Sequence, residues 1–179
     1  MDEIDRIVAE WNRERPEVDV SPTEVLQRIT RLALLQSASF ERLFAGHGLT
    51  WGEFLVLAAL RRGGPPYRMN PTALFSSLIL SSGAMTNRLD RLEAMGLIRR
   101  LPDPNDRRGR LVELTAKGRR SVDKALVDHL ANEERLLAAL SPPERRRLAE
   151  LLRKLLLSEP FRSLDPARGG SRRSAAGVR

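Results

Sequence analysis

The chain has 179 residues, a size typical of one domain with additional helices at its ends. It is 41% hydrophobic and 30% charged, with a net charge of +8. It lacks cysteine, which excludes disulfides, thiolate zinc sites and thiol catalysis. No apolar run approaches the ~18 residues that a membrane span needs, and the acidic start MDEIDR is unlike a signal peptide. We therefore expect a cytoplasmic protein with no membrane partner.

Positive charge is concentrated in two parts of the chain. Residues 1–20 carry seven acids and three arginines, a net −4, whereas residues 81–120 carry ten basic groups and five acids, a net +5. Residues 160–179 carry five arginines and one Asp, a net +4. This distribution favours a polyanionic partner that binds residues 81–120. The Gly-, Ser- and Arg-rich end is expected to be a disordered basic tail.

Helical periodicity and capping sequences predict most of the secondary structure. The capping sequences are SPTE, with Ser21 as N-cap, then TWGE, Asn70-Pro71, Thr115 and SPPE. Gly96 is a typical helix stop, and Pro160 is expected to end ordered structure. Two strands, LIRRL and RLVELT, flank the turn-rich PDPNDRRG. Helices are predicted over residues 2–15, 21–45, 51–61, 71–78, 82–95, 115–139 and 142–157.

The helix over residues 82–95 has a polar face suited to DNA. A step of about 100° per residue places Met85, Leu89 and Leu92 on one buried stripe. Asparagine can bond twice to adenine and arginine twice to guanine, and hydroxyls at a helix start can bind a phosphate. A solvated helix face explains the pattern equally well if the helix is taken alone. The predicted DNA contacts of this helix are Ser81, Ser82, Thr86, Asn87 and Arg91.

The basic hairpin that follows favours the DNA interpretation. Arg107, Arg108 and Arg110 lie at or beside its turn, and arginine can enter a narrow minor groove. Asp106 is expected to orient one of these arginines rather than to contact DNA. The alternative is a solvated turn. Three later basic residues either contact phosphates or are solvated: Lys117, Arg119 and Arg120.

The stretches SSGAMTNRLDRLEAMGLIRR and PDPNDRRGRLVELTAKG resemble the MarR family of bacterial transcription regulators. The resemblance covers about residues 21–157 and implies a mainly α fold with a small β-hairpin, in which a winged helix–turn–helix lies between dimerisation helices. It assigns Asp106 and Arg108 to the wing pair of the family. The expected domains are an extra N-terminal helix at 1–20, a dimerisation helix at 21–48, the winged helix–turn–helix at 49–114, C-terminal dimerisation helices at 115–158 and the tail at 159–179.

A subgroup of this family binds urate or related aromatic acids, and the chain resembles it at three positions. These are Trp11, for stacking, with Arg88 and Arg100, for an anion. An anion that draws Arg88 inward would shift the helix that reads DNA. Leu55 departs from the subgroup, which has an Asp there, so an aromatic acid other than urate, or no ligand, fits this chain better. Alternative roles are dimer packing for Trp11, and for Arg88 an ion pair with Asp106 or Asp90 or a phosphate contact.

Other chemistry has little support in the sequence. Two histidines without cysteine do not favour a zinc site, and RGGPP lacks the lysine of a phosphate-binding loop. We therefore expect no metal, no cofactor and no enzyme activity. The sequence predicts a homodimeric, sequence-specific DNA-binding regulator, in the form of a repressor that an anionic aromatic ligand releases from a palindromic operator. The alternative is an effector-independent, nucleoid-associated DNA-binding or protein-interaction module.

Overall fold

The computed structural model of the chain describes residues 1–78, 85–104 and 106–164, apart from the side chains of residues 107 and 108. It divides into two units, Met1–Leu55 and Val56–Arg179. The predicted fold class is confirmed, since the described chain is mainly helical with one small antiparallel sheet. The elements are α1 (Glu3–Glu14), α2 (Ser21–Ala45), α3 (Trp51–Arg62), β1 (Arg68–Met69), α4 (Pro71–Ser76), α5 (Met85–Ala94), β2 (Ile98–Asp103), β3 (Asp106–Leu114), α6 (Ala116–Leu136), α7 (Pro142–Leu156) and α8 (Glu159–Leu164).

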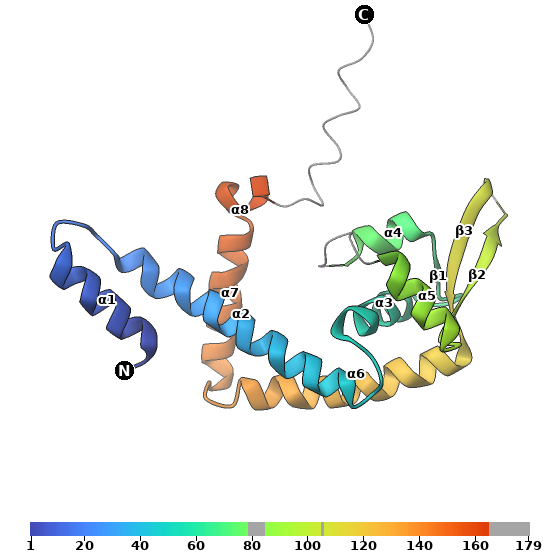
Figure 1. Cartoon of the computed structure of the whole chain (residues 1–179), viewed down its shortest axis with the longest axis horizontal. Coiled ribbons are helices and arrows are strands. Elements are labelled where there is room, and N and C mark those ends of the chain that lie inside the picture. The colour runs from blue at the N-terminus through green and yellow to red at the C-terminus, as the bar shows by residue number, and fades with distance from the viewer. Residues whose placement is uncertain (79–84, 105, 165–179) are drawn as a thin grey trace, which may run out of the picture. The chain divides into compact units, whose positions relative to one another are not determined.

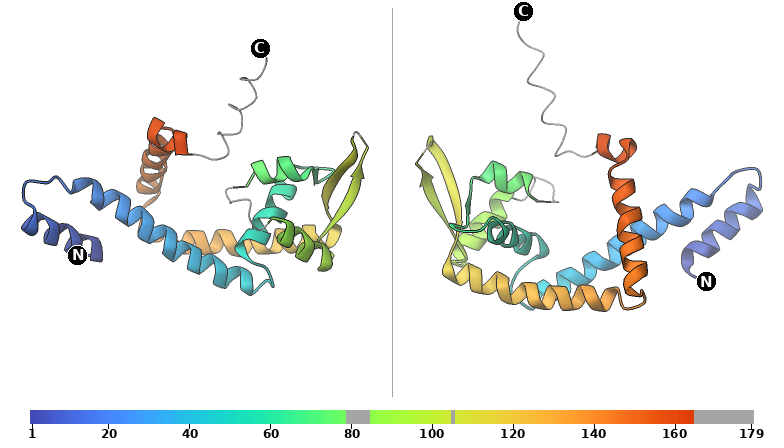
Figure 2. Two further views of the ribbon diagram at one scale, coloured as in Figure 1. Left: turned by 45° about the horizontal axis from the view of Figure 1, so that its top comes forward. Right: turned by 180° about the vertical axis from the view of Figure 1, so that it is seen from behind.

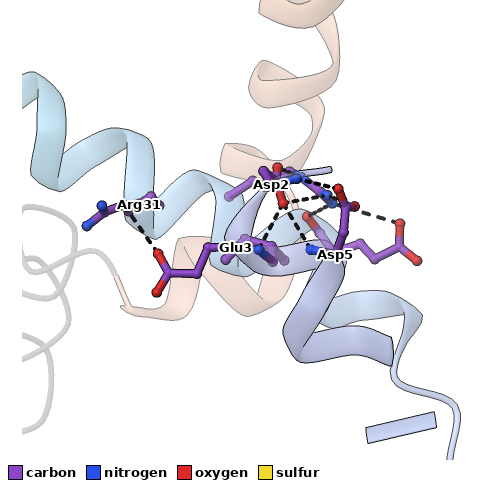
Figure 3. Close-up of polar contacts among 7 residues, drawn as sticks. Asp2, Glu3, Asp5 and Arg31 are labelled. Atoms are coloured by element: carbon purple, nitrogen blue, oxygen red, sulfur yellow. Dashed lines mark hydrogen bonds and ion pairs between the residues drawn. The ribbon is translucent and has the colours of Figure 1, made fainter. Parts of the chain in front are cut away.

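In the first unit, α1 lies beside α2 (Figure 1). The side chain of Asp2 accepts hydrogen bonds from the backbone of Ile4 and Asp5 and so caps α1. The same carboxylate accepts from Arg28 of α2, which also pairs with Asp5. Figure 3 shows these contacts together with the longer pair of Arg31 and Glu3, 3.9 Å apart. The buried apolar side of α1 and this cluster of charges hold α1 on α2.

The junction of α2 and α3 packs four aromatic rings. Phe44 stacks on Phe54 at 4.3 Å between ring centroids, and Trp51 lies 4.6 Å from Phe40. The capping box predicted for TWGE is confirmed, because the backbone N–H of Thr50 donates to the Glu53 carboxylate over 2.8 Å and the Thr50 hydroxyl accepts from the Glu53 N–H over 3.2 Å. Thus a local cap starts α3 where the aromatic side chains meet.

In the second unit, the sheet has the order β1-β3-β2 and is antiparallel throughout. Strand β1 was not predicted from the sequence, since two residues are too short to show alternation. The long strands β2 and β3 form a hairpin that extends away from α4 and α5 (Figure 2). We call this hairpin, residues 98–114, the wing. The predicted turn over 102–109 is too long, because Asp106–Leu114 is already strand and Arg110 pairs with Pro102.

The end of α5 and the start of α6 are fastened to one another. Gly96 ends α5 with φ +68°, as its position predicts. The Thr115 hydroxyl donates to the Gly96 carbonyl over 2.8 Å and accepts from the N–H of Gly118, which caps α6. Gly118 is buried against the Leu97 backbone, so closely that a Cβ would lie 2.0 Å from the Leu97 oxygen. These contacts fix where α5 stops and where the wing begins.

Two predictions at the ends of helices were wrong. The helix α2 spans Ser21–Ala45 as predicted, but its N-cap is Val20 and not Ser21, whose backbone N–H donates to the Asp19 carboxylate. Ordered structure does not end at Pro160, because α8 begins at Glu159 and proline is tolerated in the first turn of a helix. The tail from residue 165 lies outside the described residues. No helix in the described part of the chain is long and apolar enough to span a membrane.

Candidate nucleic-acid interface

The polar face predicted for residues 82–95 is exposed on α5. Leu89 and Leu92 are buried with 4% and 0% of their surface exposed, and Met85 is half-buried. The side chains on the opposite side are exposed: Thr86, Asn87, Asp90 and Arg91. An amide, a hydroxyl and a guanidinium are therefore displayed on a short helix whose apolar stripe is anchored. The predicted phosphate contacts Ser81 and Ser82 lie outside the described residues.

The wing adds basic groups to the same unit. Arg110 is exposed on β3 opposite Pro102. The backbone of Arg107 and Arg108 belongs to the first part of β3, and their side chains lie outside the described part of the structure. Glu113, at the base of the wing, accepts from Arg68 of β1 and Arg99 of β2, each over 2.7 Å. The hydrogen bonds from Arg99 and then Arg68 lower the pKa of Glu113.

Two of the three later basic residues make contacts inside the protein. The Lys117 ammonium donates to the Met95 carbonyl over 2.7 Å, so it caps the last turn of α5. The guanidinium of Arg119 lies over the ring of Tyr67 at 5.6 Å, and that of Arg61 lies 5.4 Å from the same ring. Arg120 is exposed. Lys117 therefore holds the helix that carries the polar face.

Arg88 has an unusual environment for a charged side chain. It is half-buried on α5, and its Nη1 atom is buried without a hydrogen-bond acceptor among the described residues. Leaving a buried donor unsatisfied costs about 1–3 kcal/mol, and more for a charged group. Of the two acids considered as its partner, Asp90 pairs with Arg100 instead. Arg88 thus carries a buried N–H group, at Nη1, that has no acceptor within the described structure.

Arg100, unlike Arg88, has acceptors for its side chain, because two carboxylates of α5 lie beside it. Its Nη2 donates to Asp90 Oδ1 over 2.6 Å and its Nη1 to Glu93 Oε2 over 2.7 Å. Its backbone N–H donates to Glu93 Oε1 over 2.9 Å. The hydrogen bond to Asp90 is the main cause that raises the pKa of Arg100. The sequence did not predict Asp90 and Glu93 as the partners of Arg100.

Trp11 is 52% exposed on α1. It belongs to the first unit whereas Arg88 and Arg100 belong to the second, so a common ligand site stays a prediction. Leu55 is half-buried in α3. A pocket of about 380 Å³ lies between α1 and α2 and contains none of the three predicted ligand residues. Its lining is Asp2, Glu3, Ile4, Arg28, Arg31, Leu32 and Leu35. Among the described residues, no cluster of His, Asp and Glu is arranged to hold a metal ion.

Comparison with known proteins places this interface in a family. The MarR family model matches residues 49–109, which include α3, α5 and most of the wing. The HTH-type transcriptional regulator PecS of Dickeya dadantii is 36% identical over 150 residues, which cover 84% of this chain and 90% of PecS. The chain belongs to the MarR family. As a MarR-family protein it is a winged-helix, DNA-binding transcription regulator and not an enzyme.

Solved structures of MarR-family proteins share the fold. A cysteine mutant of MarR from E. coli in complex with operator DNA is 27% identical, with a TM-score of 0.66, and the match covers 82% of this chain and 97% of that one. BpsR of Bordetella bronchiseptica is also 27% identical, with a TM-score of 0.67 and coverage of 75% and 94%. That structure is described as a mechanism for regulation of BpsR DNA binding by 6-hydroxynicotinic acid.

Proposed function

We propose that the chain is a homodimeric repressor that binds a palindromic operator, reading bases with α5 and a neighbouring minor groove with the wing. The observation that carries this proposal is the exposed set of Thr86, Asn87 and Arg91 above the buried Leu89 and Leu92. Short polar groups on an anchored helix suit the major groove, where amide and guanidinium groups distinguish bases. The arginines of β3 supply the positive charge that a minor groove attracts.

Selection of binding sites from a random duplex pool, followed by competition gel shifts, tests this proposal. We expect an inverted repeat with half-sites about one helical turn apart, and a preference for it that persists as salt rises. Asn87→Ala and Arg91→Ala should each weaken binding to the selected site by about 10- to 100-fold, with a smaller loss on random DNA. Lys124→Ala, an exposed change on α6, is the matched control. Equal affinity for all sequences would contradict the proposal.

We further propose that a small, anionic aromatic ligand releases the protein from DNA through Arg88. The buried Nη1 atom of Arg88, without an acceptor in the described structure, supports an anion at this position. Trp11 is exposed on α1 and offers a surface for stacking. The description of BpsR, whose DNA binding 6-hydroxynicotinic acid regulates, supports an aromatic acid as the class of ligand.

Titration of operator complexes with urate, 6-hydroxynicotinic acid and benzoate tests the ligand. We expect one aromatic acid to displace the protein from DNA, and Arg88→Gln to abolish that response while the preference for the operator remains. Arg120→Gln removes an exposed cation from the same unit and should keep the response. If no acid changes the affinity and Arg88→Ala only weakens DNA binding, Arg88 is a phosphate contact and the ligand proposal fails.

A second candidate function is an effector-independent regulator. It is favoured by two observations at the predicted ligand residues. Leu55 stands where the aromatic-acid subgroup has a carboxylate, and Arg100 is already paired with Asp90 and Glu93 inside the protein. The same titration separates the two candidates, because this one predicts operator binding that no aromatic acid alters.

A further inference from the structure

The ion pairs of Arg100 join two elements that must reach DNA together. Arg100 lies on β2, where it is opposite Val112 of β3, and both of its carboxylate partners lie on α5. Asp90 and Glu93 are three residues apart, so one helical face presents both to a single guanidinium fork. Glu93 also accepts the Arg100 backbone N–H, which fixes the strand itself as well as the side chain.

This cluster differs from an ordinary surface ion pair. The Arg100 side chain is only 31% exposed and donates two charge-assisted hydrogen bonds of 2.6 and 2.7 Å. The Arg100 backbone N–H donates a third, of 2.9 Å, to Glu93. Exposed single pairs contribute little, whereas a forked arginine in a network fixes geometry as well as charge. The cluster therefore restrains the angle between α5 and the wing more than their short connection through residues 95–97 does alone.

Asp90 adds a second reason for the cluster. It lies in the middle of the exposed polar face, between Thr86 and Asn87 on the helical wheel, and its side chain is 56% exposed. A free carboxylate at that place would repel DNA phosphates. The Arg100 guanidinium compensates this charge and turns the carboxylate toward β2.

We propose that Arg100 is a positioning residue for DNA recognition, which holds α5 and the wing in one relative orientation through Asp90 and Glu93. It acts without a ligand, and the inference rests on the sequence-specific DNA binding proposed above. A fixed orientation lets α5 enter the major groove while the wing enters the adjacent minor groove, so its loss should reduce binding to the operator more than binding to random DNA.

The test compares Arg100→Gln with Arg99→Gln. Arg99 is the neighbouring strand residue, and its guanidinium pairs with Glu113 of the wing instead of with α5. Both variants lose one positive charge from the same hairpin. Arg100→Gln should lose at least about tenfold in the ratio of operator to random-DNA affinity, whereas Arg99→Gln should keep that ratio. Equal ratios in the two variants would overturn the proposal.

For Asp90→Asn and Glu93→Gln, the proposed role and simple electrostatics predict opposite changes in the affinity for DNA. Each removes a negative charge, which by itself would strengthen binding to DNA. In the proposed role each lowers the affinity for the operator, and Asp90→Asn adds little loss when Arg100→Gln is already present. Stronger operator binding by Asp90→Asn would contradict the proposal. Arg100→Lys keeps the charge but not the fork and should restore only part of the ratio.

A measurement without DNA separates this inference from the function on which it rests. The chain has no cysteine, so spin labels can be placed at Ala94→Cys on α5 and Pro104→Cys beside the wing tip. We expect the distribution of label distances to broaden in Arg100→Gln and to stay narrow in Arg99→Gln, with the helical circular dichroism of both retained. An unchanged distribution in Arg100→Gln overturns the positioning role, whatever the wild-type protein binds.

Discussion

At the scale of single residues, Gly118 occupies a position where no side chain fits. A Cβ there would lie 2.0 Å from the Leu97 carbonyl oxygen and 2.8 Å from Leu114 Cδ1. Because the first contact is with backbone, α6 and the backbone of Leu97, just before β2, would have to move apart. We expect Gly118→Ala to lower the free energy of unfolding by about 3 kcal/mol or more, measured by urea denaturation at fixed protein concentration.

The control for this prediction is Gly63→Ala. Its Cβ would meet nothing closer than the Leu60 carbonyl at 3.4 Å, an ordinary contact. Its effect should stay within about 1 kcal/mol. Similar losses for both glycines would show that the close approach to Leu97 does not account for the effect.

Glu113 gives a prediction about pH. Its side chain is 12% exposed and pairs with two arginines, which lower its pKa below the ordinary value of 4.5. A lowered pKa in the folded state stabilises the protein above pH 4.5, and this contribution is lost as pH falls through the folded value. Since Arg68 and Arg99 are 41% and 58% exposed, we expect Glu113→Gln to cost only about 1 kcal/mol at pH 7.

Denaturation from pH 7 to pH 3 measures this contribution. The difference in stability between wild type and Glu113→Gln should shrink once pH falls below about 4.5. Glu150→Gln is the control, because that carboxylate is 61% exposed and 3.5 Å from Arg147. This substitution should leave the stability unchanged both at pH 7 and at pH 3. A difference that stays constant over the whole range would place the effect of Glu113 in packing rather than in its charge.

At the scale of elements, Lys117 of α6 caps the C-terminal end of α5. The Lys117 ammonium donates to the Met95 carbonyl over 2.7 Å, where the helix dipole favours a positive charge. We expect Lys117→Ala to increase hydrogen exchange in the last turn of α5 and to leave the salt dependence of DNA binding unchanged. Arg120→Ala, a nearby exposed cation, should leave exchange in α5 unchanged. If Lys117→Ala reduces the salt slope by about 0.9, Lys117 neutralises a phosphate.

The elements that the sequence predicts well are those specified within a few residues. The caps at Thr50 and Asn70, the stop at Gly96 and the two sides of α5 depend on neighbours at most four positions away. The same local rules assigned the wrong N-cap to α2, which is Val20 and not Ser21.

The contacts that the sequence did not predict join distant positions. Lys117 reaches Met95 across 22 residues, and Arg100 reaches Asp90 across ten. The sequence contains the acids Asp90 and Glu93 at helical spacing, but nothing local indicates that a strand residue is their partner. Arg100 therefore resembled a free anion-binding residue in the sequence, whereas the structure pairs it within its own unit.

At the scale of the whole molecule, the long helices expose more apolar surface than a monomer needs. On α2, Leu32, Leu34 and Leu35 are 52–63% exposed. On α6 and α7 the exposed leucines include Leu130 at 55% and Leu156 at 68%. Runs of exposed leucines on a helix are typical of protein interfaces. Their position on helices other than α5, and outside the wing, fits a second copy of the chain as the partner.

A charge placed among the exposed leucines of α6 tests the proposed dimer. Because a two-fold interface contains each substitution twice, Leu130→Glu removes two leucines, each contributing about 1.5–3 kcal/mol when buried. We expect the dimer to dissociate at least about 100-fold more readily in sedimentation experiments, and operator binding to fall with it. Lys124→Glu introduces the same charge on an exposed polar position of α6 and should remain dimeric. A Leu130→Glu variant that stays dimeric and binds its operator normally would place the interface on other helices.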